Sequence, residues 1–168
     1  MTQIRNFDKS FVRRTKANLK DYRGEYDMCN LLNCTLGLIV LPYELANRGR
    51  AFNRNPVWNR DINTIRQLQF NYLYFNPQGF DNRRNVITLP STLKNFLNKL
   101  RNGIAHQRIS PINNFRINPL TEKQELKFDE VQIQNSFPVG NVIDLDVRFS
   151  QQQLSRFAIF IVNRNLET

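Results

Sequence analysis

The hydrophobic pattern of this 168-residue chain changes from a helical to an alternating period close to Pro111. Before that residue, apolar side chains recur at every third or fourth position, which is the spacing of one face of an α-helix. After it, Ile143, Leu145, Val147 and Phe149 alternate with polar residues, which is the pattern of a half-buried strand. The chain is therefore predicted to place a helical part before a short β part.

Four helices are predicted before Pro111, each from an apolar stripe bounded by glycine, proline or a capping residue. They are expected at residues 7–24, 25–41, 60–72 and 91–104. Ser91 is the predicted N-cap of the fourth. The second is apolar on nearly every side from Met28 to Leu41, so it should lie at the centre of a bundle.

The segment after Pro111 is predicted to hold two strands and a last helix. The strand that pairs with residues 143–149 should run through Leu126, Phe128, Val131 and Ile133. Its apolar phase slips near Asp129, which indicates a β-bulge, and residues 138–140 form the turn between the strands. Ser150 and Gln153 have the spacing of a capping box, which opens the last helix.

Together these elements predict one mainly α domain over residues 1–168, because chains of this length commonly form a single core. The expected architecture is a bundle of four to five helices. A small β-hairpin at residues 112–149 is inserted before a C-terminal helix at residues 150–166.

The chain carries 24 basic against 14 acidic residues, a net charge of +10. Such a balance indicates a polyanionic partner, nucleic acid first and an anionic membrane second. No Asp or Glu occurs from Asn82 to Thr121. The RNA-binding candidates lie in the first predicted helix and in this acid-free stretch: Arg13, Arg14, Lys16, Lys94, Lys99 and Arg108. The alternative is that these side chains form merely solvated basic surfaces.

His106 is the only histidine, and it follows Arg101 by five positions near the end of the fourth predicted helix. Histidine exchanges a proton near neutral pH, and the planar fork of arginine binds two phosphate oxygens at once. RNA supplies its own nucleophile, the 2′-OH, so its cleavage needs only a base, an acid and a cation. Asn102 shares a helix face with His106. The alternative role of His106 is a helix C-cap that interacts with the helix dipole.

Two details of this segment extend the hypothesis. Gly103 costs about 1 kcal/mol inside a helix, which indicates either a close backbone approach or a loosened last turn. One histidine cannot easily act as both base and acid, so the chemistry favours a symmetric homodimer with two Arg–His pairs in one cleft.

The run from Arg101 to His106 resembles the R-x(4–6)-H motif of the HEPN superfamily, the higher eukaryotes and prokaryotes nucleotide-binding domains. Residues 33–44, NCTLGLIVLPYE, are similar to the N-x-L-L-G-L-L-V-x-P-x-E helix of one group of HEPN nucleases. The resemblance covers roughly residues 5–110. HEPN toxins that pair with nucleotidyltransferase antitoxins usually carry Tyr two positions after the histidine. Arg108 stands there in this chain, so regulation by tyrosine nucleotidylation is not expected.

Many HEPN members are metal-independent ribonucleases of toxin–antitoxin, CRISPR and phage-defence systems. The resemblance therefore implies a HEPN-like helical bundle and an endoribonuclease of the toxin or defence type, with RNA as its substrate. It implies no cofactor and a composite site in a homodimer, where Arg101, Asn102 and His106 are catalytic. An antitoxin or a defence-system protein is a further candidate partner. The rival hypothesis is a catalytically silent HEPN-like domain that binds RNA or a regulatory partner.

Three residues outside the motif are candidates for supporting this site. Asn30 and Asn33 form a polar stripe with Gly37 on the second predicted helix, and Glu44 follows its end. The alternatives are that the asparagines lie in a bundle seam and that Glu44 is a solvated or structural carboxylate.

Metal and membrane functions are not expected from the sequence. The spacing of Cys29 and Cys34 fits neither a zinc knuckle nor a redox pair, and no second histidine exists to complete a metal site. The longest apolar run, residues 38–42, is far shorter than the ~20 residues that cross a bilayer. No apolar signal segment is visible near the first residues. A cytoplasmic protein without a membrane partner is therefore expected.

Overall fold

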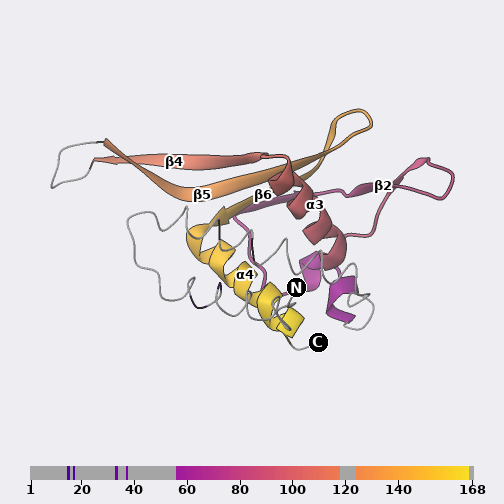
Figure 1. Cartoon of the computed structure of the whole chain (residues 1–168), viewed down its shortest axis with the longest axis horizontal. Coiled ribbons are helices and arrows are strands. Elements are labelled where there is room, and N and C mark those ends of the chain that lie inside the picture. The colour runs from indigo at the N-terminus through magenta and orange to yellow at the C-terminus, as the bar shows by residue number, and fades with distance from the viewer. Residues whose placement is uncertain are drawn as a thin grey trace, which may run out of the picture.

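The computed structural model describes residues 56–117 and 124–166, together with four single helical positions, Thr15, Ala17, Asn33 and Gly37. Figure 1 shows how the elements are arranged. In chain order they are the 3-10 helices η2 (Pro56–Asn59) and η3 (Ile62–Thr64), the strands β1 (Tyr72–Phe75), β2 (Gln78–Phe80) and β3 (Val86–Thr88), the helix α3 (Leu93–Ala105), the strands β4 (Ile109–Ile117), β5 (Gln124–Phe137) and β6 (Val142–Ser150), and the helix α4 (Gln151–Leu166).

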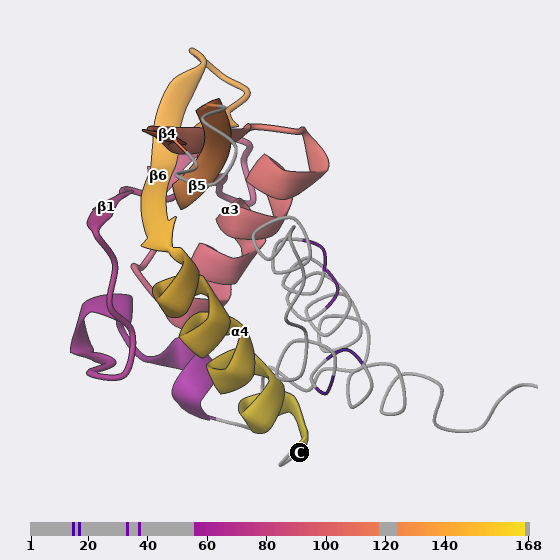
Figure 2. The same cartoon turned by 90° about the vertical axis from the view of Figure 1, so that its left-hand side faces the viewer.

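The described part of the chain is built on an antiparallel sheet. Its four strands follow the order β1-β6-β5-β4, while β2 and β3 form a separate two-stranded hairpin. Figures 1 and 2 show α3 and α4 on the same side of the four-stranded sheet, with β6 continuing directly into α4. The prediction of a mainly α bundle of four to five helices with a small inserted hairpin is therefore wrong. The sheet forms one wall of the core.

Two strands account for much of this error. Only Tyr72 of β1 falls within the helix predicted at residues 60–72, and the rest of that strand has no assignment from the sequence. The β4 strand shows no clear alternation because it contains Pro111 and two adjacent asparagines. Proline removes one backbone donor from a ladder, so it is confined to edge strands. The β4 strand is such an edge, which explains why Pro111 is tolerated there.

The helix predicted at residues 60–72 does not form. The short η3 helix begins at Asp61, whose side chain accepts a hydrogen bond of 2.8 Å from the Asn63 N–H. The chain then bonds to the segment before α3: the Ile62 N–H donates to Ser91 O, and the Leu93 N–H donates to Arg60 O. The second pairing uses the Arg60 carbonyl, which would have accepted an internal hydrogen bond in a helix.

The hairpin of β5 and β6 confirms most of the sequence prediction, including the turn after Phe137. Opposite the β4 strand, Asp129 is left without a partner between Phe128 and Glu130, which is the predicted bulge. Ser150 and Gln153 exchange the two hydrogen bonds of a capping box at the start of α4.

A second bulge was not predicted and changes which side chains are buried. In the β5–β6 ladder, Asn135 pairs with Leu145 and Ser136 pairs with Ile143, so Asp144 is the extra residue. The bulge breaks the simple alternation of β6: Asp144 becomes fully buried and Ile143 is exposed.

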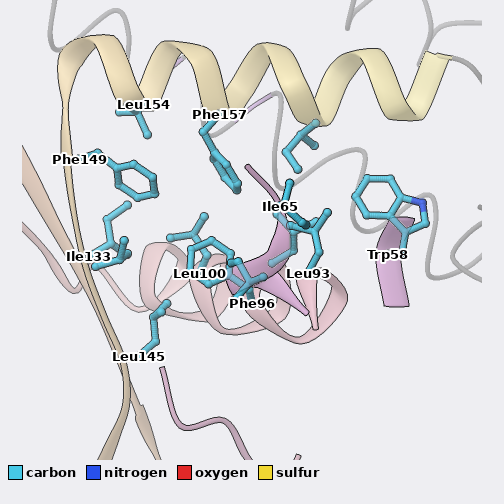
Figure 3. Close-up of a cluster of buried hydrophobic side chains, with 14 of the residues drawn as sticks. Trp58, Ile65, Leu93, Phe96, Leu100, Ile133, Leu145, Phe149, Leu154 and Phe157 are labelled. Atoms are coloured by element: carbon cyan, nitrogen blue, oxygen red, sulfur yellow. The ribbon is translucent and has the colours of Figure 1, made fainter. Parts of the chain in front are cut away.

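The core of the described residues lies between the sheet and the helices α3 and α4, as Figure 3 shows. Phe157 of α4 contacts Phe96 of α3 and Phe149 of β6, with ring centroids 5.7 and 5.6 Å apart. Trp58 of η2 is also buried in this cluster. Aromatic pairs of this kind add about 0.5–1.5 kcal/mol beyond the burial of their area, so they hold α3 and α4 against β6.

The packing of α3 on the sheet depends on Gly103. A Cβ atom at this position would lie 2.3 Å from the backbone oxygen of Gln134 in β5. The close backbone approach that the sequence suggested is therefore present. It brings the last turn of α3, which carries the Arg–His motif, directly against the sheet.

Replacing Gly103 with alanine should destabilise the fold, although alanine is the better helix former by about 1 kcal/mol. Overpacking typically costs about 1–3 kcal/mol, and the Gln134 backbone cannot rotate away from the added methyl group. Gly79→Ala is the matched control, because there the added Cβ would meet only the Leu89 side chain. Urea unfolding should show the larger loss for Gly103→Ala. Equal losses would contradict the close approach.

Candidate active site

The motif residues Arg101, Asn102 and His106 lie together at the C-terminal end of α3. Arg101 and Asn102 are half-buried, and the Arg101 Nη1 donates a 2.7 Å hydrogen bond to the Asn102 side-chain oxygen. The Asn102 amide in turn donates to the Asn98 side-chain oxygen at 3.2 Å. This chain of contacts along α3 orients the guanidinium group of Arg101.

His106 is the C-cap of α3 and is exposed. Its backbone N–H donates to Asn102 O at 3.0 Å, which ties it to the residue beside the motif arginine. Within the described part of the chain, its imidazole ring has no hydrogen bond or ion pair. The ring is therefore accessible for proton exchange with an external group.

The turn after His106 has a defined geometry. Gln107 adopts a positive φ of 56°, and its N–H donates to Ile104 O, while the Arg108 N–H donates to Gly103 O. These are the two bonds of a Schellman motif, which ends a helix by satisfying its last carbonyl groups. The Gln134 N–H then donates to Arg108 O, which anchors the turn to β5. The position of His106 is thus set by backbone contacts on both sides.

Lys99 has a different role from the one its charge indicated. Its ammonium group forms a 2.6 Å ion pair with the fully buried Asp144 and donates to Gln78 O, also at 2.6 Å. It also lies 5.2 Å from the centroid of the Phe137 ring. An ammonium group held in this way is not available to a phosphate, so Lys99 is removed from the proposed RNA-binding set.

The buried pair is the feature that the sequence interpretation missed. The second oxygen of Asp144 accepts a 2.7 Å hydrogen bond from the buried Asn135 amide. Asp144 stands at a polar position of an alternating strand, a pattern that predicts an outward-facing side chain. Its partner Lys99 lies on a different element and can be identified only from the fold.

The remaining candidate residues are distributed as follows. Arg108 is exposed, and its Nη1 donates to Ser136 O at 3.3 Å. Lys94 is half-buried and is not without an interaction partner. Asn33 is helical and exposed. Five candidates lie outside the described residues: Arg13, Arg14, Lys16, Asn30 and Glu44.

The described geometry suits phosphate chemistry at the end of α3. An oriented arginine can hold a phosphate, and an exposed imidazole can carry a proton to or from it.

None of the helices in the described ranges is both long and apolar enough to cross a membrane.

Comparison with models of known protein families gives a match over nearly the whole chain. A family model described as HEPN pEK499 p136 matches residues 1–167. Nothing matches among curated proteins or among solved structures.

Proposed function

The chain belongs to the HEPN pEK499 p136 family, and from that membership we propose that it is an endoribonuclease with Arg101 and His106 at its active site. HEPN domains are commonly ribonucleases, which supports the reaction class. The observation that carries the proposal is the state of His106. It is exposed, lacks a side-chain hydrogen bond or ion pair within the described residues, and stands at the C-cap of the helix that carries Arg101.

The reaction is a transfer of phosphorus from the 5′-oxygen to the 2′-oxygen of the preceding nucleotide. A base takes the 2′-OH proton as the new bond to phosphorus forms, and an acid protonates the 5′-oxygen as the old bond breaks. Arg101 binds the phosphoryl oxygens, on which negative charge grows. Asn102 keeps the Arg101 guanidinium oriented through their 2.7 Å hydrogen bond. No metal is needed for these steps.

A second copy of the chain completes the site in this proposal. The sequence has one histidine, and a general base and a general acid are both needed. A homodimer with the ends of its two α3 helices facing one another supplies both. An antitoxin or a defence-system protein that covers this surface would regulate the enzyme. Arg108, which is exposed close to His106 in the chain, is retained as an RNA-binding candidate.

A silent HEPN-like binding domain is the second candidate, and one observation favours it. His106 is the C-cap of α3, where an imidazolium group also stabilises the helix dipole. In this alternative the motif is structural, and the domain binds RNA or a regulatory partner without cutting it.

Purified protein should cleave single-stranded RNA in the presence of EDTA and leave a 2′,3′-cyclic phosphate and a 5′-OH. Mass spectrometry of the fragments checks the product ends, and sedimentation of the same preparation at micromolar concentration should show a dimer. RNA that is bound but not cut would contradict the proposal and favour the silent domain. Cleavage that requires a divalent cation would contradict the proposed mechanism.

A further inference from the structure

One face of the four-stranded sheet points away from the core. Residues directly opposite one another in an antiparallel pair share a face. In one row, Leu73 pairs with Val147 and Val147 pairs with Ile133, and all three pack in the core. The neighbouring row must therefore point outward. It contains Tyr72, which pairs with Arg148, and Gln132, which pairs with Arg148 from the other side.

Two tyrosines stand on this outer face. Tyr72 and Tyr74 lie two positions apart on β1, at the edge of the sheet, and are 45% and 41% exposed. Their Cα atoms are about 7 Å apart, since a strand rises ~3.4 Å per residue. This spacing allows two neighbouring flat ligand groups to stack on separate rings.

Arg148 adds a positive charge beside these rings. Its guanidinium carbon lies 5.3 Å from the centroid of the Tyr72 ring, and its Nε is buried without a hydrogen-bond partner. The nearest carboxylate along β6, Asp146, instead accepts hydrogen bonds of 2.8 to 3.0 Å from the amides of Gln132 and Gln134. Within the described part of the chain, Arg148 therefore has no ion pair.

Two acidic groups on this face, Asp146 and Glu130, already accept hydrogen bonds. Asp146 accepts the two glutamine amides, and Glu130 accepts a hydrogen bond from the Asn71 amide. The Arg148 guanidinium, in contrast, lies beside the exposed ring of Tyr72. Stacking surfaces beside an unpaired arginine recognise unpaired bases and the phosphates that join them.

We propose that Tyr72, Tyr74 and Arg148 form a stacking platform for two consecutive unpaired bases of single-stranded RNA. The tyrosine rings stack on the bases, and Arg148 binds the intervening phosphate. The identity of the ligand as RNA rests on the proposed function. The platform lies on the sheet, separate from the motif at the end of α3, so it serves binding and not the chemical step.

The test measures binding of a fluorescent oligouridylate of about 12 nucleotides, a typical site size, by anisotropy in the His106→Ala background. Tyr72→Leu and Tyr74→Leu should each weaken binding about tenfold, because leucine is apolar but cannot stack. The matched variants Tyr72→Phe and Tyr74→Phe should keep the parent affinity. Arg148→Gln should reduce the salt slope by about 0.7, the value for one contact to a single strand, whereas the leucine variants should leave it unchanged.

Two outcomes would overturn the platform: unchanged affinity in the leucine variants, or an equal loss in the phenylalanine variants. Binding of a duplex RNA of the same length should not respond to the leucine substitutions, since paired bases cannot stack on the rings. Thermal unfolding of each variant checks that the sheet is intact. If protein that retains His106 cleaves RNA but the leucine substitutions leave RNA affinity unchanged, the platform is wrong and the ribonuclease proposal still holds. If the leucine substitutions weaken RNA binding but protein that retains His106 does not cleave RNA, the ribonuclease proposal is wrong and the platform still holds.

Discussion

His106→Ala and Arg101→Ala should each remove most of the ribonuclease activity and leave the chain folded. Proton transfer by a positioned side chain is worth about 10²–10⁴-fold in rate, and a group that stabilises developing negative charge is worth about 10²–10³-fold. The losses for His106→Ala and Arg101→Ala should fall in these two ranges. The fold should tolerate both changes because His106 is exposed and Arg101 is only half-buried. The double variant should be little worse than either single one, since groups that act as a unit are not additive.

Two further variants refine this expectation. Arg101→Lys should leave RNA binding largely intact but lower turnover, because a point charge replaces a planar fork. Asn102→Ala should cost less activity than loss of Arg101, since Asn102 orients the guanidinium without binding the phosphate itself. Single-turnover cleavage with a labelled RNA gives the rates, and circular dichroism checks folding. Full activity in His106→Ala would contradict the assignment of the site.

Lys99→Met and Asp144→Asn should each lower the free energy of unfolding by about 3–5 kcal/mol. That is the usual cost of removing one partner from a buried ion pair. Either change leaves an uncompensated group: Asp144 is fully buried, and Lys99 is 7% exposed. Lys99 also links α3 to β2 through Gln78 O, so its loss should loosen the helix that carries the motif.

The double variant Lys99→Met with Asp144→Asn should cost less than the sum of the two single changes, because the groups are in contact. Arg108→Met is the control: it removes an exposed cation that donates to a backbone oxygen, and it should cost less than about 1 kcal/mol. Urea unfolding measures all four proteins. If the single variants lose as little free energy of unfolding as the Arg108 control, the Lys99–Asp144 ion pair does not stabilise the fold as a buried pair should.

Features set by local sequence were predicted well. The capping box of Ser150 and Gln153 depends on residues three positions apart, and it forms as expected. The α3 helix was found from its apolar stripe, although its N-cap is Thr92 and not Ser91. The close approach at Gly103 is one of the two explanations that the cost of glycine within a helix indicated.

Features that depend on distant partners were missed. The four residues of β1 are all apolar or aromatic and show no alternation, so only pairing with β6 identifies them as a strand. The bulge at Asp144 cannot be seen in a strand that alternates almost perfectly. The sequence-based assignment of Lys99 to RNA failed for the same reason, since a basic residue in an acid-free stretch finds its carboxylate 45 positions away. The motif itself was recognised because its residues are close in the chain.

The central claim is that the 2′-OH of the RNA is the nucleophile at the Arg101–His106 site. Its most direct test is single-turnover cleavage of an RNA that carries one 2′-deoxy nucleotide immediately before the mapped cut. This site should resist cleavage while the unmodified RNA is cut, and the two substrates should bind with closely similar affinity. Cleavage at the deoxy position at the unmodified rate would show that a nucleophile other than the 2′-OH attacks the phosphate.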